Sequence, residues 1–441
     1  MARENVKLPK QGLPREKVLE HLDDLHEGDA NWKEGRTWSL VYYAGEEHTS
    51  FLKSAYTKYF SENGLSPLAF PSIKKFETEV VAMTADILGG DENVTGTMTS
   101  CGTESILMAV KTHRDWFRST RPEIKNPEML LPATAHPAFE KAAHYFDVAS
   151  VRIPVKADFR ADVEAMRRAI NQNTIMLVGS APSYPHGVVD PIAELAAAAK
   201  ERGLGMHVDS CLGGFLLPFV KKLGYPVPEF DFRVDGVTSI SADIHKYGFA
   251  AKGASTVLYR NPDIRRHQFF VYTDWCGGVY MSPTMAGTRP AGSIAAAWAT
   301  MQAMGEDGYL RNAKQIMSTT EALIKGISAI PGLHILGKPV MSVFAFTSDE
   351  FNVFALADAM EARGWHLDRQ QQPSALHMMI TLAHEKVVDQ FLTDLRASVE
   401  HVKANPSTAN EGSAPMYGMM ATIPDRGMIR NFVFEAMDNI Y

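Results

Sequence analysis

The chain has few cysteines for its length, only Cys101, Cys211 and Cys276 in 441 residues. They lie far apart in the sequence and match none of the paired spacings that hold zinc, so the sequence offers no metal site. Such sparse use is typical of a reduced, cytoplasmic protein without a disulfide framework. For Cys101 and Cys211 a small buried thiol is a plainer interpretation than a catalytic one.

Long apolar runs and an excess of basic residues are also missing. No stretch approaches the roughly 20 apolar residues that span a bilayer, and residues 1–7 lack the apolar centre of a signal peptide. Lys and Arg number 44 against 51 Asp and Glu, a net charge of −7, so the surface offers no general attraction for nucleic acid or anionic lipid. We therefore expect no nucleic-acid partner and no membrane anchor.

What is present is a large apolar fraction, 45% of the residues, arranged in two different patterns. Short apolar runs alternate with helix-like segments through the middle of the chain, as in a mostly parallel sheet covered on both faces. These runs are 148–155, 174–179, 205–208, 234–240 and 254–259. After Gly308 the pattern changes to that of a small α+β unit. We predict an N-terminal arm over 1–60, a large domain over 61–308 and a small domain over 309–441.

A lysine lies where this fold can bury it, in the segment Ser241-Ala242-Asp243-Ile244-His245-Lys246-Tyr247-Gly248. A desolvated ammonium is costly, and forming an imine with an aldehyde cofactor removes that cost. Pyridoxal 5'-phosphate is the obvious aldehyde. The sequence therefore points to Lys246 as the residue that carries this cofactor.

Three further features fall near the expected carboxyl edge of the sheet, where ligands bind in α/β folds. The loop from Thr99 to Ser105 leads into a helix whose free amides, at Gly102 and Thr103, would cradle an anion; Ser100 or Thr103 acting as a simple helix cap is the alternative. Asp209 ends an apolar strand and needs a cation, either a protonated pyridine nitrogen or an arginine. His136 precedes a helix, where a histidine is more often a cap than a ligand.

Several longer stretches resemble one enzyme family, and together they extend from about Gly35 to Met428. They are Val41-Tyr42, Phe70 to Val81, Thr99 to Ser105, Pro185 to Pro191, His207 to Asp209, Ser241 to Gly253, Thr273 to Tyr280 and Ala286 to Gly292. On these residues the chain resembles the sphingosine-1-phosphate lyase family, in its soluble bacterial form, within the pyridoxal-phosphate decarboxylase group. No single short motif explains agreement over so much of the chain.

The resemblance implies an α/β protein of pyridoxal-phosphate fold type I, like aspartate aminotransferase, with a large mostly parallel sheet and a small α+β C-terminal domain. It also implies an internal Schiff base on Lys246, a pyridine ring stacked by His136 and paired with Asp209, and a phosphate contacted by His245 with help from Ser241. Without the resemblance, His245 could equally be a core histidine and Lys252 a solvated loop residue.

The family's reaction, carried over by resemblance, is retro-aldol cleavage of the C2–C3 bond of a phosphorylated long-chain amino alcohol. The products are a fatty aldehyde and phosphoethanolamine, as in sphingolipid metabolism. Tyr42 and Lys252 resemble residues near the reacting atoms and are our candidates for moving protons, without a choice between them as the base. Tyr42 and Asn63 are also expected to bind substrate, and so is the residue at the place of a family histidine, Ser66.

The resemblance further implies a homodimer with shared active sites. Arg289 lies in a turn that approaches the neighbouring subunit's site in relatives, where its guanidinium fork would bind the substrate phosphate. Gly287 and Thr288 would contact the cofactor phosphate across that interface. The chain departs from the family pattern at Ser66, Cys101 and Ser210, which leaves the preferred substrate open.

Two other interpretations remain at this point. An amino-acid α-decarboxylase on the same scaffold would share Lys246, Asp209 and His136, and would differ only in residues on the substrate side. A regulatory protein that binds the cofactor without turnover is disfavoured, because all the expected chemical residues are present. A purely structural α/β scaffold would leave the lysine, aspartate and histidine unexplained.

Overall fold

The computed structural model describes residues 7–423 and 425–440, and its centre is a seven-stranded sheet in the order β1-β7-β6-β5-β4-β2-β3. The strands are β1 (Thr95–Thr99), β2 (Glu128–Pro132), β3 (Ala149–Ile153), β4 (Thr174–Ser180), β5 (Gly205–Asp209), β6 (Ser239–Ala242) and β7 (Ser255–Tyr259). Strands β6, β5, β4, β2 and β3 are mutually parallel, and only β7 pairs antiparallel, with β1 and with β6. The predicted mostly parallel sheet is confirmed.

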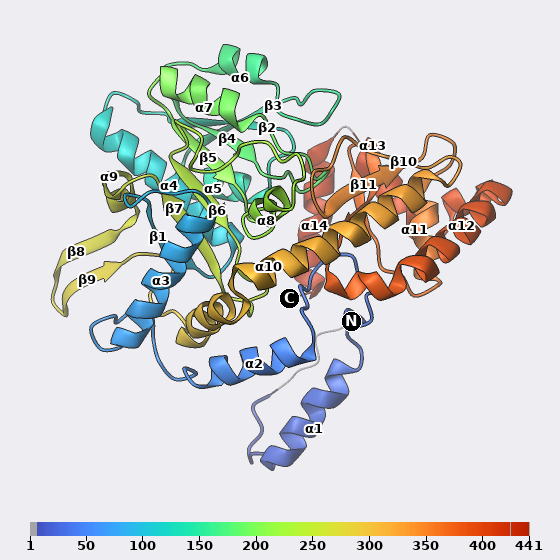
Figure 1. Cartoon of the computed structure of the whole chain (residues 1–441), viewed down its shortest axis with the longest axis horizontal. Coiled ribbons are helices and arrows are strands. Elements are labelled where there is room, and N and C mark those ends of the chain that lie inside the picture. Colours follow the sequence, from blue (N-terminus) through green and yellow to red (C-terminus); the bar gives the residue numbers. More distant parts are fainter. Residues whose placement is uncertain (1–6, 424, 441) are drawn as a thin grey trace.

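Helices cover this sheet because its strands are buried almost throughout and need apolar cover on both faces (Figure 1). They are α3 (Pro71–Ile87), α4 (Gly102–Thr120), α5 (Ala138–Phe146), α6 (Val163–Ala169), α7 (Ile192–Glu201), α8 (Leu217–Lys222) and α9 (Pro262–Arg265), the last followed by η1 (Arg266–Gln268). A separate two-stranded hairpin, β8 (Phe270–Trp275) and β9 (Gly278–Ser282), projects away from the body (Figure 1).

The long helix α10 (Ala291–Ser328) leads from the large sheet to the small domain and is broken at Gly305, whose φ is 55°. Beyond it lies a four-stranded antiparallel sheet in the order β10-β11-β13-β12 with its own apolar core. Its elements are β10 (His334–Ile335), β11 (Val343–Thr347), α11 (Val353–Glu361), β12 (Asp368–Gln371), β13 (Ser374–Met379), η2 (Leu382–Val387) and α12 (Val388–Ala404). The expected boundary after 308 falls just beyond the break in α10.

The two ends of the chain add helices outside these layers. They are α1 (Arg15–His26), α2 (Glu46–Thr57), η3 (Pro406–Asn410), α13 (Ala414–Thr422) and α14 (Arg426–Ile440). No residue of α1 is buried, which fits an arm that leaves the body of the molecule. Residues 1–6 of that expected arm, and residues 424 and 441, lie outside the described residues. None of the helices in the described ranges is long and apolar enough to cross a bilayer.

Some elements differ from the sequence-based expectation. The run 234–240 is a strand only from Ser239, since residues 231–236 form turns whose carbonyls accept hydrogen bonds from Arg260. Strands β1 and β2 and the β8–β9 hairpin were not predicted. All six side chains of β8 are exposed, the polar and the apolar ones alike. This strand therefore lacks the alternation of polar and apolar residues that marks a strand with one buried face.

Candidate active site

Parallel strands deliver the central side chains to one edge of the large sheet. Strand β5 ends at Asp209 and β6 ends at Ala242, and the tight turn that follows β6 carries Asp243, His245 and Lys246. There they surround a cavity of about 170 Å³. Its lining is Cys101, Gly102, Thr103, Ile106, His136, Pro182, Tyr184, Asp209, Cys211, Leu212, Asp243, His245 and Lys246. Segments more than 100 residues apart therefore meet at the predicted place.

Lys246 is held at the floor of this cavity by an ion pair. Its Nζ lies 2.9 Å from Oδ2 of Asp243, whose side chain is almost completely buried. Burial disfavours the ammonium, but the adjacent Asp243 carboxylate outweighs burial and raises the pKa of Lys246. The same contact, with help from His245, lowers the pKa of Asp243 despite its own burial.

Asp209 is a buried carboxylate without an arginine or lysine partner within 4 Å in the described chain. Its Oδ1 accepts hydrogen bonds from the Cys211 amide at 3.1 Å and from the Ser241 hydroxyl at 3.3 Å. Both bonds go to Oδ1, so Oδ2 is left for a ligand. The alternative of a structural ion pair with an arginine is not what the structure has.

Ser241 has a different place from the one predicted. Its hydroxyl is fully buried behind Asp209, where it contacts the Asp209 carboxylate and His207 Nε2, and it does not line the cavity. Ser241 of β6 is the register partner of Asp209 of β5, so the two side chains lie next to each other on one face of the sheet. Ser241 therefore supports Asp209 from outside the cavity lining.

The first turn of α4, where the sequence predicts an anion cradle, lies at the cavity. Among the described residues no side chain caps this helix, because the Ser100 hydroxyl donates to Glu104 Oε2 at 2.7 Å. The simple-cap alternative is therefore wrong, and Gly102 and Thr103, whose amides have no partner within a first helical turn, line the cavity. A Cβ at Gly102 would lie only 2.7 Å from Asp243 Oδ2 and 2.8 Å from Cys211 Sγ.

The two predicted histidines, His136 and His245, both line the cavity. Burial lowers the pKa of each, so they are neutral near pH 7. His136 Nδ1 accepts the Ala138 amide at 3.1 Å, so this residue is a helix cap as well as a wall of the cavity. His245 is 8% exposed, and its Nδ1 has no hydrogen-bond partner among the described residues. An orphaned buried nitrogen beside an uncapped helix N-terminus fits a phosphate, and so these residues fit pyridoxal phosphate.

Tyr42 and Lys252 lie together beside the Lys246 cavity. Lys252 Nζ is 5.4 Å from the centre of the Tyr42 ring and donates to the Leu40 carbonyl at 2.9 Å. Burial raises the pKa of Tyr42, whereas burial and the nearby Lys246 charge lower the pKa of Lys252. Tyr42 thus keeps its proton more firmly than usual, and Lys252 releases its proton more readily.

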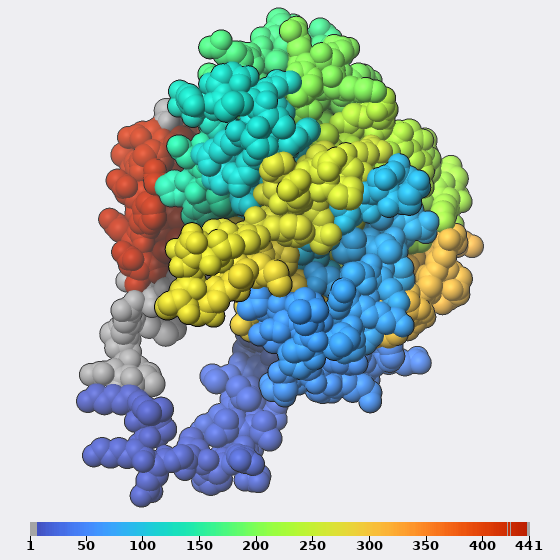
Figure 2. Space-filling view, turned by 90° about the vertical axis from the view of Figure 1, so that its left-hand side faces the viewer, coloured from blue at the N-terminus to red at the C-terminus, as the bar shows by residue number. Residues whose placement is uncertain are grey.

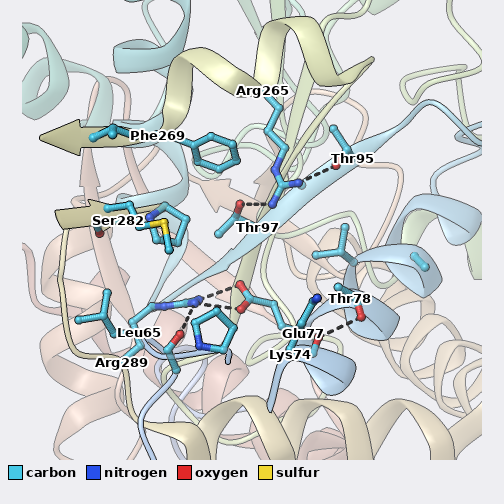
Figure 3. A pocket seen from close by; sticks show the side chains of 18 of the residues that line it. Leu65, Lys74, Glu77, Thr78, Thr95, Thr97, Arg265, Phe269, Ser282 and Arg289 are labelled. Carbon is cyan, nitrogen blue, oxygen red and sulfur yellow. Dashed lines mark hydrogen bonds and ion pairs between the residues drawn. The ribbon is translucent and has the colours of Figure 1, made fainter. Parts of the chain in front are cut away.

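Arg289 does not present a free guanidinium. Its NH1 and NH2 donate to the two carboxylate oxygens of Glu77 at 2.7 and 2.9 Å (Figure 3). Further bonds reach the Met98 and Gly64 carbonyls. The fork that was predicted to bind the substrate phosphate is therefore occupied by a carboxylate of the same chain. Sequence could not reveal this, because Glu77 and Arg289 are far apart along the chain.

Two other groups of predicted residues lie outside the Lys246 cavity: Asn63 and Ser66, predicted to bind substrate, and Gly287 and Thr288, predicted to contact the cofactor phosphate across a dimer interface. Asn63 Oδ1 accepts the amides of Leu65 and Arg289, at 2.8 and 3.3 Å, while Ser66 and Thr288 are exposed and Gly287 is half-buried. Within one chain none of them lines the Lys246 cavity. Glu77 and Arg289 line a separate pocket of about 560 Å³ between α3 and the β8–β9 hairpin, which Figure 3 shows from close by.

Comparison with known proteins identifies the family of this chain. Residues 1–348 match the family described as the pyridoxal-dependent decarboxylase conserved domain. Sphingosine-1-phosphate lyase from Oryza sativa subsp. japonica is 49% identical over 441 residues, which cover 98% of this chain and 81% of that protein. The chain belongs to the sphingosine-1-phosphate lyase family. Sphingosine-1-phosphate lyase 1 of Rattus norvegicus is 45% identical, with 98% of this chain and 77% of that protein covered.

A solved structure extends this relationship to the lyase fold. The sphingosine-1-phosphate lyase of Burkholderia pseudomallei superposes with a TM-score of 0.91 at 40% identity, covering 99% of this chain and 97% of that one. Glutamate decarboxylase of Lactobacillus brevis superposes with a TM-score of 0.80 at 19% identity, over 91% of this chain and 96% of that one, and shares the fold alone. The predicted family, fold type I, carbon–carbon lyase class and pyridoxal-phosphate cofactor are confirmed.

The departures from the lyase family pattern leave the cavity intact. Ser210, where the family has alanine, turns its hydroxyl into the interior and donates to the Ala181 carbonyl at 2.9 Å. Cys101 is half-buried and lines the cavity at the start of α4. Cys211 also lines the cavity, and burial raises the pKa of its thiol. Both cysteines are therefore part of the cavity wall.

Two residues in the site of this lyase-family chain were missed from the sequence. Asp243 lies three positions before Lys246, and this spacing in a turn was an available signal for an ion pair. Tyr184 also lines the cavity, stacked on His377 with ring centres 4.2 Å apart, and burial, with the Asp368 charge, raises its pKa to about 12. No signal in the sequence separated Tyr184 from other aromatic residues.

Proposed function

We propose that this protein cleaves the C2–C3 bond of a phosphorylated long-chain amino alcohol, such as sphingosine 1-phosphate, to a fatty aldehyde and phosphoethanolamine. One observation carries the proposal: a chain 49% identical to a sphingosine-1-phosphate lyase gathers Lys246, Asp209, His136, His245 and the N-terminus of α4 around one cavity. These are the groups needed to hold pyridoxal phosphate at its aldehyde, ring and phosphate.

Each residue has a role that follows from its position. Lys246 would hold the cofactor through its amine. Bound there, the cofactor would supply an electron sink for the bond that breaks, and the Asp209 carboxylate, unpaired in the described chain, would hold a proton at the ring nitrogen. His136 would flank the ring, and His245 Nδ1 with the α4 amides would hold the phosphate.

We assign proton transfer to Lys252 and Tyr42. The lowered pKa of Lys252 makes its neutral amine accessible, so we assign Lys252 as the base that takes the proton of the C3 hydroxyl. The raised pKa of Tyr42 keeps its hydroxyl protonated, so Tyr42 donates a hydrogen bond to the substrate or returns a proton to the product. Ser66 and Asn63 remain proposed substrate contacts.

The deciding experiment identifies the products. The enzyme loaded with pyridoxal phosphate is incubated separately with dihydrosphingosine phosphate and with a panel of amino acids, and the aldehydes are identified by mass spectrometry. We expect the long-chain aldehyde and phosphoethanolamine from the lipid, and no carbon dioxide from the amino acids. Carbon dioxide without aldehyde would support the α-decarboxylase and overturn the lyase proposal. Lys246→Ala is the control, and it should lose the visible absorption of the bound cofactor.

We also propose a homodimer whose sites are shared. The support is that Gly287 and Thr288, which are predicted to contact a cofactor phosphate, do not line the Lys246 cavity of their own chain. The β8–β9 hairpin, whose Tyr280 lies next to Gly287, leaves large apolar side chains in solvent, with Trp275 53% and Val279 68% exposed. Figure 2 shows the yellow hairpin next to the blue residues around α3 on one face. A second copy covering this face would bring Thr288 to the partner's cofactor phosphate.

Mixing two inactive variants tests the shared site. Lys246→Ala lacks the cofactor lysine, and Thr288→Glu would repel a phosphate. If Thr288 serves the neighbouring subunit, a heterodimer regains one intact site, and a random mixture recovers up to about a quarter of wild-type activity. No recovery, or a monomer of full activity in sedimentation, would contradict the proposal.

We further propose a cytoplasmic location. The three cysteines are all free in the structure, which suits a reducing compartment. Fractionation of cells that make the protein should place it with cytoplasmic markers, and recovery with membranes would contradict this.

A further inference from the structure

The roles given above leave one buried charged side chain of the cavity unused, Asp243. It is 2% exposed, and its Oδ2 is 2.9 Å from Lys246 Nζ and 3.8 Å from His245 Nε2. A carboxylate buried this deeply is costly unless a cation and hydrogen bonds compensate for it. Its place under the reactive nitrogen therefore calls for a functional explanation.

A chain of buried hydroxyls fixes this carboxylate from behind. Ser255 donates to Asp243 Oδ1 at 2.5 Å, Ser105 Oγ lies 2.8 Å from Ser255 Oγ, and Thr99 Oγ1 lies 2.6 Å from Ser105 Oγ. These residues belong to β7, α4 and β1, so three elements determine where the carboxylate stands. Gly102, at the first turn of α4, closes over it from the cavity side.

Several elements bring charged and titratable groups close to the Lys246–Asp243 pair. These groups are His245, Tyr247 and Lys252 of the pair's own segment, Tyr42, Asp209 at the end of β5, Cys211 after that strand, His136 before α5, and Tyr184 after β4. Asp243 is the opposite charge in direct contact with the lysine. It is the main cause that raises the pKa of Lys246 against burial.

We propose that Asp243 is a positioning residue that keeps the proton on the Lys246 nitrogen, in the free amine and in the imine with the cofactor aldehyde. The proposal rests on the proposed function, in which Lys246 carries pyridoxal phosphate. The amine and the aldehyde condense with loss of water, and the imine nitrogen keeps a proton because the carboxylate stands beside it. A protonated imine is the more electrophilic form, and so it exchanges faster with the substrate amine.

The test is a pH titration of the holoenzyme's absorption, since protonated and neutral imines absorb at different wavelengths. In wild type the visible band of the protonated imine should persist to a pH at least about one unit above that of a pyridoxal phosphate–butylamine imine in the same buffer. Asp243→Asn should lower the midpoint by at least about one unit, a tenfold change in the acid dissociation constant. Asp243→Glu, which keeps the charge, should restore most of the shift.

A matched control is Asp231→Asn. Asp231 is equally buried at 2% exposure, but it pairs with Arg233 away from the cavity, so its variant should titrate as wild type. An unchanged midpoint in Asp243→Asn would overturn the proposal. If that variant does not fold, a wild-type midpoint equal to that of the butylamine imine overturns it equally well.

Failure of the proposal can be separated from failure of the proposed function. Borohydride reduction followed by peptide mass spectrometry locates the cofactor, and product analysis detects the aldehyde. Cofactor on Lys246 and aldehyde release with no shift in Asp243→Asn would reject only the role of Asp243. Cofactor on another residue would reject the proposed function itself.

Discussion

At the scale of single residues, Gly102 is the position where the smallest change should have the largest effect on the cofactor. A methyl group there would lie 2.7 Å from Asp243 and 2.8 Å from Cys211, closer than side-chain atoms pack. We expect Gly102→Ala to weaken pyridoxal-phosphate binding at least about tenfold, the equivalent of about 1.4 kcal/mol. Absorption titration of the apoenzyme measures the affinity. Gly418→Ala, where no atom lies within 4 Å, should bind as wild type.

Also at the scale of single residues, Lys252 should determine how the activity depends on pH. A base must be neutral, and the lowered pKa of Lys252 means that kcat/KM rises with pH at values below the ordinary lysine range. Arginine stays charged at every accessible pH, so Lys252→Arg should lose at least about 100-fold in activity and this rise with pH. The exposed Lys53→Arg on α2 is the control. An unchanged pH profile in Lys252→Arg would assign the base elsewhere.

At the scale of elements, the Glu77–Arg289 pair joins α3, β1 and the turn that carries Gly287 and Thr288. Glu77 Oε1 accepts from Arg289 and from the Met98 amide of β1, which leads into the anion cradle. Glu77→Gln removes the charge from a pair whose side chains are 10% and 17% exposed, and should destabilise the protein by about 1–3 kcal/mol. Displacing the turn should also weaken cofactor binding in the dimer.

Urea unfolding and cofactor titration measure these two effects. Asp86→Asn is the matched control, because Asp86 lies on the same helix and is exposed. A loss of stability without any loss of cofactor affinity would show that the pair only holds the fold.

At the scale of the whole molecule, the core contains neutral histidines that make the fold sensitive to acid. Burial lowers the pKa of His113, His186, His377 and His384 to about 4 and that of His207 to about 3. Unfolded, these residues take up protons near pH 6.5, so the unfolded state binds more protons between about pH 4 and 6.5. Stability should therefore fall as the pH drops through this window.

Each such histidine costs the fold on the order of 1–2 kcal/mol at pH 5. Burial raises the pKa of Asp190 to about 6, which acts in the opposite direction but is one group against five. We expect a clear drop in Tm between pH 7 and pH 5 in differential scanning calorimetry. His207→Gln should reduce the drop, and a Tm independent of pH over this range would contradict the prediction.

The sequence alone determined the features that follow from residues close together along the chain. The alternation of apolar runs and helical segments indicated the covered parallel sheet, and a lysine in the turn after β6 marked the cofactor site. Asp209 and the α4 N-terminus could be predicted because the ends of parallel strands meet at one edge. The resemblance over most of the chain then supplied the family, which composition and spacing could not.

The tertiary structure decided which distant side chains pair. Arg289 meets Glu77, Ser241 turns behind Asp209, and Asp243 receives its hydrogen bonds from a serine of β7 and, through it, from α4 and β1. These contacts join residues 12, 32 and 212 positions apart, and such separations leave no periodic trace in the sequence. They arise only when the chain is packed, because burial then requires every charge and polar atom to find a partner.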